Sequence, residues 1–322
     1  MESEKLKANN EWLVWARETA HYNIEDLAKK IKKPTKTIKE WESTGLIRWN
    51  DLEELSEHYQ RPSHIFFSKN KPIYEEYIPP DFRTFNNKKE DVTPNMAFEI
   101  RNAKYKRNVL LNLEDESNDF TFPYFELKNL PTNDINKVTD FIREKLSMNR
   151  AKISLKKLNH WISKIESLGV LIFEFYGIDP DELRGYALYY DKLPIIGINH
   201  REFDNPKKFT LFHELAHLIL KKDGMSNLSG YFLNDDEEAT CNKIAADILV
   251  PSKLFRSLNE EFNRNNFDDM DVELLSKKFK VSKEVIIRKA LDLNLINKKE
   301  YNKKINEFQY YLTERKKNQL IK

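Results

Sequence analysis

The run HELAH at residues 213–217 constrains this 322-residue chain more than any other feature. Its two histidines are four residues apart, so on an α-helix, with 3.6 residues per turn, both imidazoles leave the same face and can bind one zinc ion. Residues 205–224 carry independent helix signals: Asn205 suits the N-cap, Pro206 the first helical position and Gly224 the residue after the end. We therefore expect a helix here that presents both histidines at one edge.

The histidines alone leave two interpretations open. His213 and His217 could bind a metal, or they could be core histidines whose nitrogens are satisfied by backbone carbonyls. A tetrahedral catalytic zinc needs a third protein ligand and leaves its fourth position to water. A second segment that could supply this ligand would favour the metal.

Residues 238–250 provide that segment. They are apolar at helical spacing, follow an acidic run and end before Pro251, which predicts a helix. Small alanines would let this helix approach the first one closely. Glu238 is therefore the expected third ligand, and Glu237 is the alternative. Favourable charge at a helix start would also explain both acids without zinc.

These two segments resemble the ImmA/IrrE-type metallopeptidases, which are gluzincin-like enzymes with HExxH on one helix and a glutamate on the next. The matching stretches are residues 208–218 and 238–251, and the family pattern, counted back from Asn242, places the ligand on Glu238. Cys241 stands where alanine is usual and Ile244 where phenylalanine is usual. Weaker similarity extends over most of the chain except residues 86–135 and about the last twenty.

The residue types predict a mechanism. One zinc ion per chain, held by His213, His217 and Glu238, would lower the pKa of its bound water to about 7 and polarise a peptide carbonyl. Glu214 lies beside the metal without being able to bind it, so it is the expected general base. Manganese or iron in place of zinc stays open. Three candidates for stabilising the oxyanion, each also explicable by packing, are Arg184, Tyr186 and Tyr231.

Upstream of the motif, three runs are rich in β-branched and aromatic residues and are separated by turn signals. They are residues 169–175, 186–190 and 194–199, and they predict a small antiparallel sheet. An exposed edge of this sheet could accept an extended peptide as an extra strand. A sheet that only completes the core is equally compatible with the pattern.

The N-terminus predicts four short helices, at residues 11–22, 24–31, 35–43 and 50–59. The apolar residues expected to close their core are Trp12, Trp15, Ala16, Leu27, Ala28, Ile31, Ile38, Trp41, Leu52 and Leu55. The middle pair is typical of a helix-turn-helix, with Thr35 capping the second helix. The pattern resembles the XRE (lambda-repressor-like) domains often fused to this peptidase family, with Lys32 replacing the usual turn glycine.

Lysines cluster on this helix pair and favour contact with phosphates of double-stranded DNA through residues 24–43. The candidate contact residues are Lys33, Thr35, Lys36, Thr37 and Lys39. However, residues 1–70 hold 12 Lys and Arg against 12 Asp and Glu, so the segment has no net positive charge. A dimerisation or repressor-docking module with the same fold is the alternative.

Composition favours a cytoplasmic protein. The chain is 40% hydrophobic and 33% charged, with a net charge of +2 and a single cysteine, which excludes an internal disulfide. Cys241 is expected to be a small buried side chain. No apolar run reaches the roughly 20 residues needed to cross a bilayer, and the start lacks a secretory apolar segment, so we expect no membrane partner.

The expected fold class is α+β: an N-terminal all-α helix-turn-helix bundle, then a mainly α metallopeptidase domain with a small antiparallel sheet. The predicted parts are 1–70 (XRE-like domain), 71–135 (linker and connecting helix), 136–255 (peptidase) and 256–322 (C-terminal helical region). Further helices are expected at 93–113, 134–148, 154–168, 271–279, 282–293 and 298–322. The pair 271–293 could form a second helix-turn-helix, but a supporting helical layer is favoured.

Together with the resemblance, these features favour a zinc-dependent endopeptidase that cleaves an XRE-type repressor or antitoxin and relieves repression of stress or mobile-element genes. The alternative is a DNA-binding regulator whose peptidase-like domain acts as a sensor or dimer platform. An intact Glu214 favours the enzyme. A homodimer stays open as a further partner.

Overall fold

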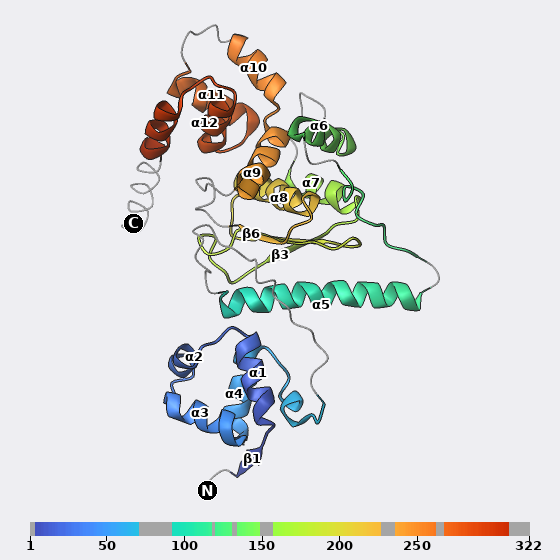
Figure 1. Ribbon diagram of the computed structural model, residues 1–322, viewed down its shortest axis with the longest axis vertical. Coiled ribbons are helices and arrows are strands. Elements are labelled where there is room, and N and C mark those ends of the chain that lie inside the picture. The colour runs from blue at the N-terminus through green and yellow to red at the C-terminus, as the bar shows by residue number, and fades with distance from the viewer. Residues whose placement is uncertain are drawn as a thin grey trace. The chain divides into compact units, whose positions relative to one another are not determined.

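The computed structural model describes residues 4–70, 92–117, 120–130, 134–148, 157–226, 236–261 and 267–308. The chain divides into two compact units: the first holds residues 1–83 and 87–118, and the second holds 84–86 and 119–322. Both are mainly helical and each contains a small sheet, which confirms the expected α+β class (Figure 1). The finer division into linker, peptidase domain and C-terminal region stays a prediction.

The first unit is a helical bundle that also contains a short β-ribbon. Its elements are β1 (Lys5–Lys7), α1 (Asn10–Thr19), α2 (Ile24–Lys30), α3 (Thr35–Thr44), β2 (Leu46–Arg48), α4 (Trp49–Tyr59), the 3-10 helix η1 (Ser63–Phe67) and α5 (Pro94–Glu116). The core predicted for the first four helices is confirmed, with Trp15 at its margin. The antiparallel β1–β2 ribbon departs from the expected all-α bundle.

The turn between α2 and α3 differs from the prediction in one respect. Pro34, in extended conformation, is the N-cap of α3 and has no side-chain cap, so Thr35 is the first helical residue and does not cap the helix. Proline disfavours helical backbone in the residue before it, so the helix does not extend back to Lys33. Lys32 adopts the left-handed conformation, with φ of 54°, that the usual glycine would take.

The sheet of the second unit has strand order β3-β5-β4-β6. Its strands are β3 (Leu171–Phe175), β4 (Gly185–Leu188), β5 (Ile195–Asn199) and β6 (Gly224–Ser226). β4 pairs antiparallel with both β5 and β6, but β3 pairs in parallel with β5. The expected antiparallel sheet is therefore wrong for one pair, because β5 inserts between β3 and β4 and runs in the direction of β3.

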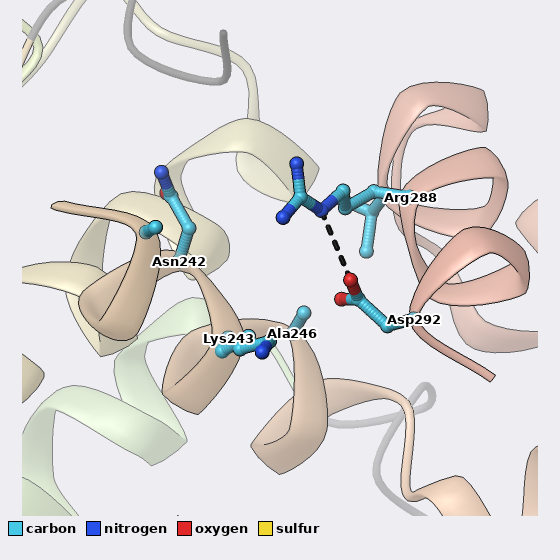
Figure 2. A pocket seen from close by; sticks show the side chains of 7 residues that line it. Asn242, Lys243, Ala246, Arg288 and Asp292 are labelled. Atoms are coloured by element: carbon cyan, nitrogen blue, oxygen red, sulfur yellow. Dashed lines mark hydrogen bonds and ion pairs between the residues drawn. The ribbon is translucent and has the colours of Figure 1, made fainter. Parts of the chain in front are cut away.

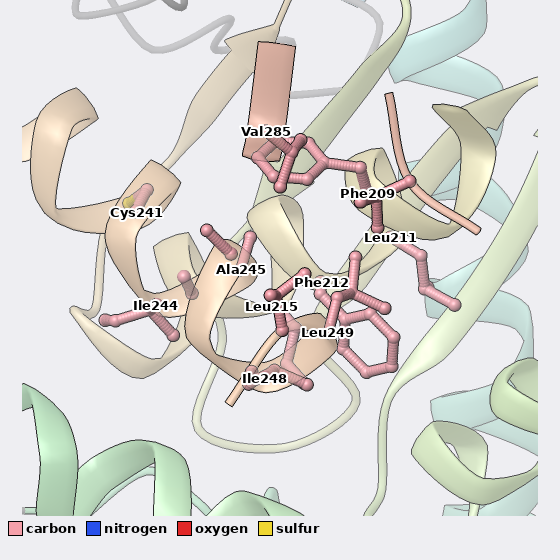
Figure 3. Packing of buried hydrophobic residues seen from close by; sticks show 14 of the residues in the cluster. Phe209, Leu211, Phe212, Leu215, Cys241, Ile244, Ala245, Ile248, Leu249 and Val285 are labelled. Carbon is pink, nitrogen blue, oxygen red and sulfur yellow. The ribbon is translucent and has the colours of Figure 1, made fainter. Parts of the chain in front are cut away.

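The helices of this unit are α6 (Ile135–Lys145), α7 (Leu158–Glu166), α8 (Asp204–Ile219), α9 (Asp236–Leu249), α10 (Ser252–Glu261), α11 (Asp269–Phe279) and α12 (Lys283–Asp292). Residues 298–308 are also helical, and the rest of the predicted tail helix lies outside the described residues. The sequence did not predict α10. Figure 3 shows α8 and α9 packed together, with Phe212 and Leu215 facing Ile248 and Leu249.

α8 is the central helix of the unit, and its side chains from Lys207 to Ile219 are buried. It begins earlier than predicted: Phe203 is the N-cap, so Asn205 and Pro206 lie within the first turn. Proline is tolerated there because first-turn amides have no intrahelical acceptor. It also ends earlier than predicted, since Lys221 takes the left-handed conformation after the helix and Gly224 begins β6.

The α11–α12 pair has the geometry of a second helix-turn-helix, but it serves as packing. Lys280 is left-handed, with φ of 53°, and Ser282 caps α12. Along α12, Val285, Ile286 and Ile287 are buried, so this helix does not present a free face like that of α3. This burial supports the favoured supporting layer, which stays a prediction.

Candidate metal centre

Three side chains from α8 and α9 meet at one buried point. Nε2 of His213 and Nε2 of His217 are 3.1 Å apart. The Glu238 carboxylate lies across from both, with Oε2 at 3.2 Å from the His213 nitrogen and Oε1 at 3.1 Å from the His217 nitrogen. These are the three residues that the sequence predicted as ligands.

The spacing of these atoms fits a single small cation. A tetrahedral zinc ion with bonds of about 2.0–2.1 Å holds its ligand atoms roughly 3.3 Å apart, close to the three distances observed. The Nε2 atom of each histidine faces the Glu238 carboxylate, and all three side chains are largely buried. Two nitrogens and a carboxylate in this arrangement form a donor set suited to zinc.

Electrostatics at this point favour an ionised carboxylate. Burial raises the pKa of Glu238, but the two facing imidazoles outweigh it, and the net pKa is well below the usual range. For His217, burial lowers the pKa, but Cys241 and Glu238 beside the ring raise it overall. The site therefore holds a stable negative charge, and an ion bound there would displace the proton that this charge favours on His217.

Glu214 is fully buried on α8, between the two histidines in sequence. It is not one of the three residues whose ligand atoms converge. Its Oε1 lies only 2.9 Å from where a side chain on Gly185 of β4 would begin, so its carboxylate faces the sheet. Glu214 is thus next to His213 in the chain, and its carboxylate is not among the converging ligand atoms.

Glu237, the alternative third ligand, points elsewhere. Its Oε2 lies 3.4 Å from Nζ of Lys222, and it is absent from the converging cluster. Two neighbouring acids on one helix thus differ in position, one in the cluster and one near the surface. This geometry favours Glu238, as the family pattern does.

Two of the three candidates for stabilising the oxyanion make contacts elsewhere in the second unit. Tyr186 is fully buried and stacks on Phe175, with ring centroids 5.7 Å apart. Nε of Arg184 lies 3.1 Å from Oε1 of the buried Glu202. Tyr231 lies outside the described residues. None of these contacts aims a donor at the metal cluster.

Cys241 and the outer face of α9 complete the surroundings. The Cys241 side chain is fully buried, as expected, and interacts with His217.

A small pocket lies between α9 and α12, lined by Asn242 and by Arg288, whose Nε donates to Asp292 at 3.2 Å (Figure 2). Asn242 thus lines the α12 contact, and the sequence did not reveal this role.

The candidate DNA-contact residues lie around the start of α3. Lys33 Nζ donates to Asp51 of α4 at 2.6 Å, so this amine is already engaged. Thr35, Lys36 and Lys39 are exposed, and Thr37 is half-buried. The exposed lysines are therefore better placed for a phosphate than Lys33.

Comparison with known families supports the resemblance in the second unit. Residues 165–291 match the model of the IrrE N-terminal-like domain, Peptidase_M78, and this segment contains α8, α9 and all three residues of the candidate metal centre. The match supports a metallopeptidase of the ImmA/IrrE type in this part of the chain. No curated protein matches the chain. None of the described helices has the length and apolar character of a membrane span.

Proposed function

We propose that the chain is a zinc-dependent endopeptidase. The observation that carries the proposal is the convergence of His213, His217 and Glu238 within 4.8 Å of one another, beside the buried Glu214. The family match over residues 165–291 supports the same class of enzyme. A helix with two histidines and a neighbouring helix with one glutamate is sufficient for a catalytic zinc that keeps one position open.

In this proposal, metal binding and proton transfer are carried out by different residues. His213, His217 and Glu238 hold the ion, which when bound supplies a Lewis acid and lowers the pKa of water. Glu214 takes the proton released from water and delivers it to the leaving amine. Its burial beside the sheet keeps bulk solvent from competing for that proton.

We further propose that the substrate is an XRE-type repressor or antitoxin, so that cleavage relieves repression of stress or mobile-element genes. The support is the resemblance of the N-terminal helices to XRE domains together with the peptidase match. A module of the substrate's own fold could bring the enzyme to the repressor or to its operator.

The substitution Glu214→Gln tests catalysis apart from metal binding. Gln keeps the shape of the side chain but cannot accept the proton, so the variant should retain one zinc per chain and lose at least about 100-fold in cleavage rate. Zinc, manganese and iron are measured on the purified protein, and cleavage is assayed on a repressor encoded beside the gene. Equal cleavage by the wild type and the variant would contradict the proposed mechanism.

A second candidate function, transcriptional regulation through DNA binding, is favoured by one observation. Lys36 and Lys39 are exposed on α3, which follows a helix-turn-helix turn. Lys36→Glu with Lys39→Glu should weaken duplex binding and flatten its salt dependence, whereas Lys69→Glu, exposed outside the helix pair, should change little. If wild type binds operator DNA but cuts no candidate with zinc present, regulation becomes the leading function.

A further inference from the structure

The face of the sheet that lies under the HELAH segment of α8 carries small residues. Ala187 of β4 pairs with Gly224 of β6, and Gly185 lies two residues from Ala187 on the same strand. Because side chains alternate between the faces of a strand and paired residues share a face, these three positions lie on one face. Gly185 touches Glu214 and Gly224 touches His217, so this is the face that α8 covers.

The space at Gly185 is enclosed by α8 and the neighbouring strand. A Cβ at this position would lie 2.5 Å from Cγ2 of Thr210, 2.9 Å from Oε1 of Glu214 and 3.0 Å from the carbonyl oxygen of Gly197. The first two distances are shorter than real Cβ contacts and the third is tight, so something would have to move.

Thr210 cannot easily yield. Its hydroxyl donates to Oε2 of Glu202 at 3.0 Å, and the other oxygen of Glu202 faces Arg184 at 3.1 Å. Rotation of the Thr210 methyl group would break the bond to the buried Glu202. The Gly197 oxygen belongs to the backbone of β5. The carboxylate end of Glu214 is the flexible one of the three neighbours, so it gives way first, and the remaining contact with Thr210 shifts the strand or the helix as well.

The space at Gly224 is filled by one side chain. A Cβ there would lie 2.9 Å from both Cε1 and Nδ1 of His217 and 3.0 Å from its Nε2. The three distances are nearly equal, so the added carbon would stand over the face of the imidazole and push the ring away. That motion would remove Nε2 from its position 3.1 Å from His213 and from Glu238.

We propose that Gly185 and Gly224 are positioning residues, which rests on the proposed peptidase function: Gly185 fixes the general base Glu214, and Gly224 fixes the metal ligand His217. The two glycines separate the two tasks of the site. A methyl group at Gly185 on β4 should impair proton transfer and leave zinc binding unchanged. A methyl group at Gly224 on β6 should weaken zinc binding.

The expected cause is space and not backbone strain. Among the described glycines, those with positive φ are Gly45, Gly169 and Gly177, so alanine can adopt the backbone conformation of Gly185 and of Gly224. Gly177 supplies the opposite case: its φ is 80°, and a Cβ there would meet nothing within 4 Å. Gly177→Ala is therefore a control that costs backbone strain without touching the site.

The test measures zinc affinity and cleavage separately. Gly224→Ala should weaken zinc binding by about 10–100-fold, the usual cost of disturbing the groups that orient a ligand. Gly185→Ala should keep its zinc and lose about 100-fold in kcat, the expected effect of displacing a catalytic group by about 1 Å. Gly177→Ala should change neither. Unaltered zinc affinity in Gly224→Ala, or unaltered kcat in Gly185→Ala, would overturn the corresponding assignment.

Two further measurements do not depend on cleavage. In the cobalt-substituted protein, the pH midpoint of the visible spectrum should move in Gly185→Ala in the same direction as in Glu214→Gln, and an unmoved midpoint would contradict the role of Gly185. For Gly224, the stability cost of the added methyl group should largely disappear in a His217→Ala background. A cost that persists there would show that the imidazole is not what the methyl displaces.

A last variant identifies which neighbour of Gly185 matters. Thr210→Ser removes Cγ2 and keeps the hydroxyl that bonds Glu202. In Gly185→Ala with Thr210→Ser, the contact with Glu214 remains, so the defect in kcat should persist. Complete recovery would assign the defect to the Thr210 methyl group and overturn the proposal. If wild type binds zinc but cleaves nothing, the proposed function fails, while the cobalt and stability measurements still test the two glycines.

Discussion

At the scale of single residues, the candidate site depends on one turn of helix. His213 and His217 converge because their spacing is fixed by α8, and Glu238 reaches them because α9 packs on that helix through small residues such as Ala245. The four-residue spacing and the acid on the next helix are both local features of the amino-acid sequence. For this reason the sequence alone predicts all three members of the cluster.

The glycines around the site could not be predicted in this way. The sequence predicts a helix terminator at Gly224 because this residue follows the apolar run, but Gly224 contacts His217 from a strand. Gly185 contacts Glu214 only because β4 lies under α8. Such roles follow from strand register and from which face a helix covers, and neither is encoded by local spacing.

The buried carboxyl of Glu284 leads to a prediction about how stability depends on pH. Burial raises the pKa of this carboxyl from 4.5 to about 7, with Arg184 partly opposing the effect. Between these values the folded state binds more protons than the unfolded state, so the free energy of unfolding should fall as pH rises from about 4.5 to about 7. Urea unfolding should show Glu284→Gln to be more stable than wild type at pH 8 by on the order of 1–3 kcal/mol, with little difference at pH 4. The same pH dependence in both proteins would contradict this assignment.

At the scale of elements, the chain's own signals predict most helices but not all of their ends. Periodic apolar residues locate α2, α3, α4, α9 and α12. The start of α8 escapes prediction because its N-cap, Phe203, has no capping side chain, and α10 escapes prediction because Pro251, just before it, is a helix-terminating signal. The parallel β3–β5 pair depends on contacts far apart in sequence, which periodicity does not report.

Lys32 after α2 and Gly45 after α3 both have left-handed backbone, so opposite substitutions at these two positions should have opposite effects on stability. Lys32 has φ of 54°, which costs a non-glycine residue roughly 1–2 kcal/mol, so Lys32→Gly should stabilise the first unit by about 0.5–1 kcal/mol after the entropy of the unfolded chain is counted. At Gly45 the change is reversed: φ is 68° and a Cβ would lie 2.2 Å from the Ala8 carbonyl oxygen. Gly45→Ala should therefore cost more than about 2 kcal/mol. Denaturant unfolding checks both, and destabilisation by Lys32→Gly would contradict the argument.

At the scale of the molecule, each unit has its own core, and the second is tied together by a buried polar network. Asp247 of α9 accepts hydrogen bonds from Thr139 of α6 at 2.9 Å and from the Ser252 hydroxyl at the start of α10 at 2.6 Å. It also pairs with the buried Lys289 of α12. One carboxylate thus joins four helices around the core that carries the candidate metal centre.

Removal of that carboxylate should be costly. Asp247→Ala leaves the Lys289 ammonium buried without its counter-charge, and we expect a loss of about 3–5 kcal/mol in the free energy of unfolding. Asp292→Ala is the control, because Asp292 pairs with the more exposed Arg288 and should cost less than about 1 kcal/mol. Similar losses in both variants would contradict a central role for the buried network.

If His213, His217 and Glu238 hold one zinc ion, the metal content of two paired variants should show it. Glu238→Gln and Glu237→Gln change neighbouring acids on the same helix, but only Glu238 lies in the cluster. After purification with zinc and removal of loosely bound metal, wild type and Glu237→Gln should contain one zinc per chain, and Glu238→Gln should contain little. Equal zinc in the two variants, or none in the wild type, would contradict the account.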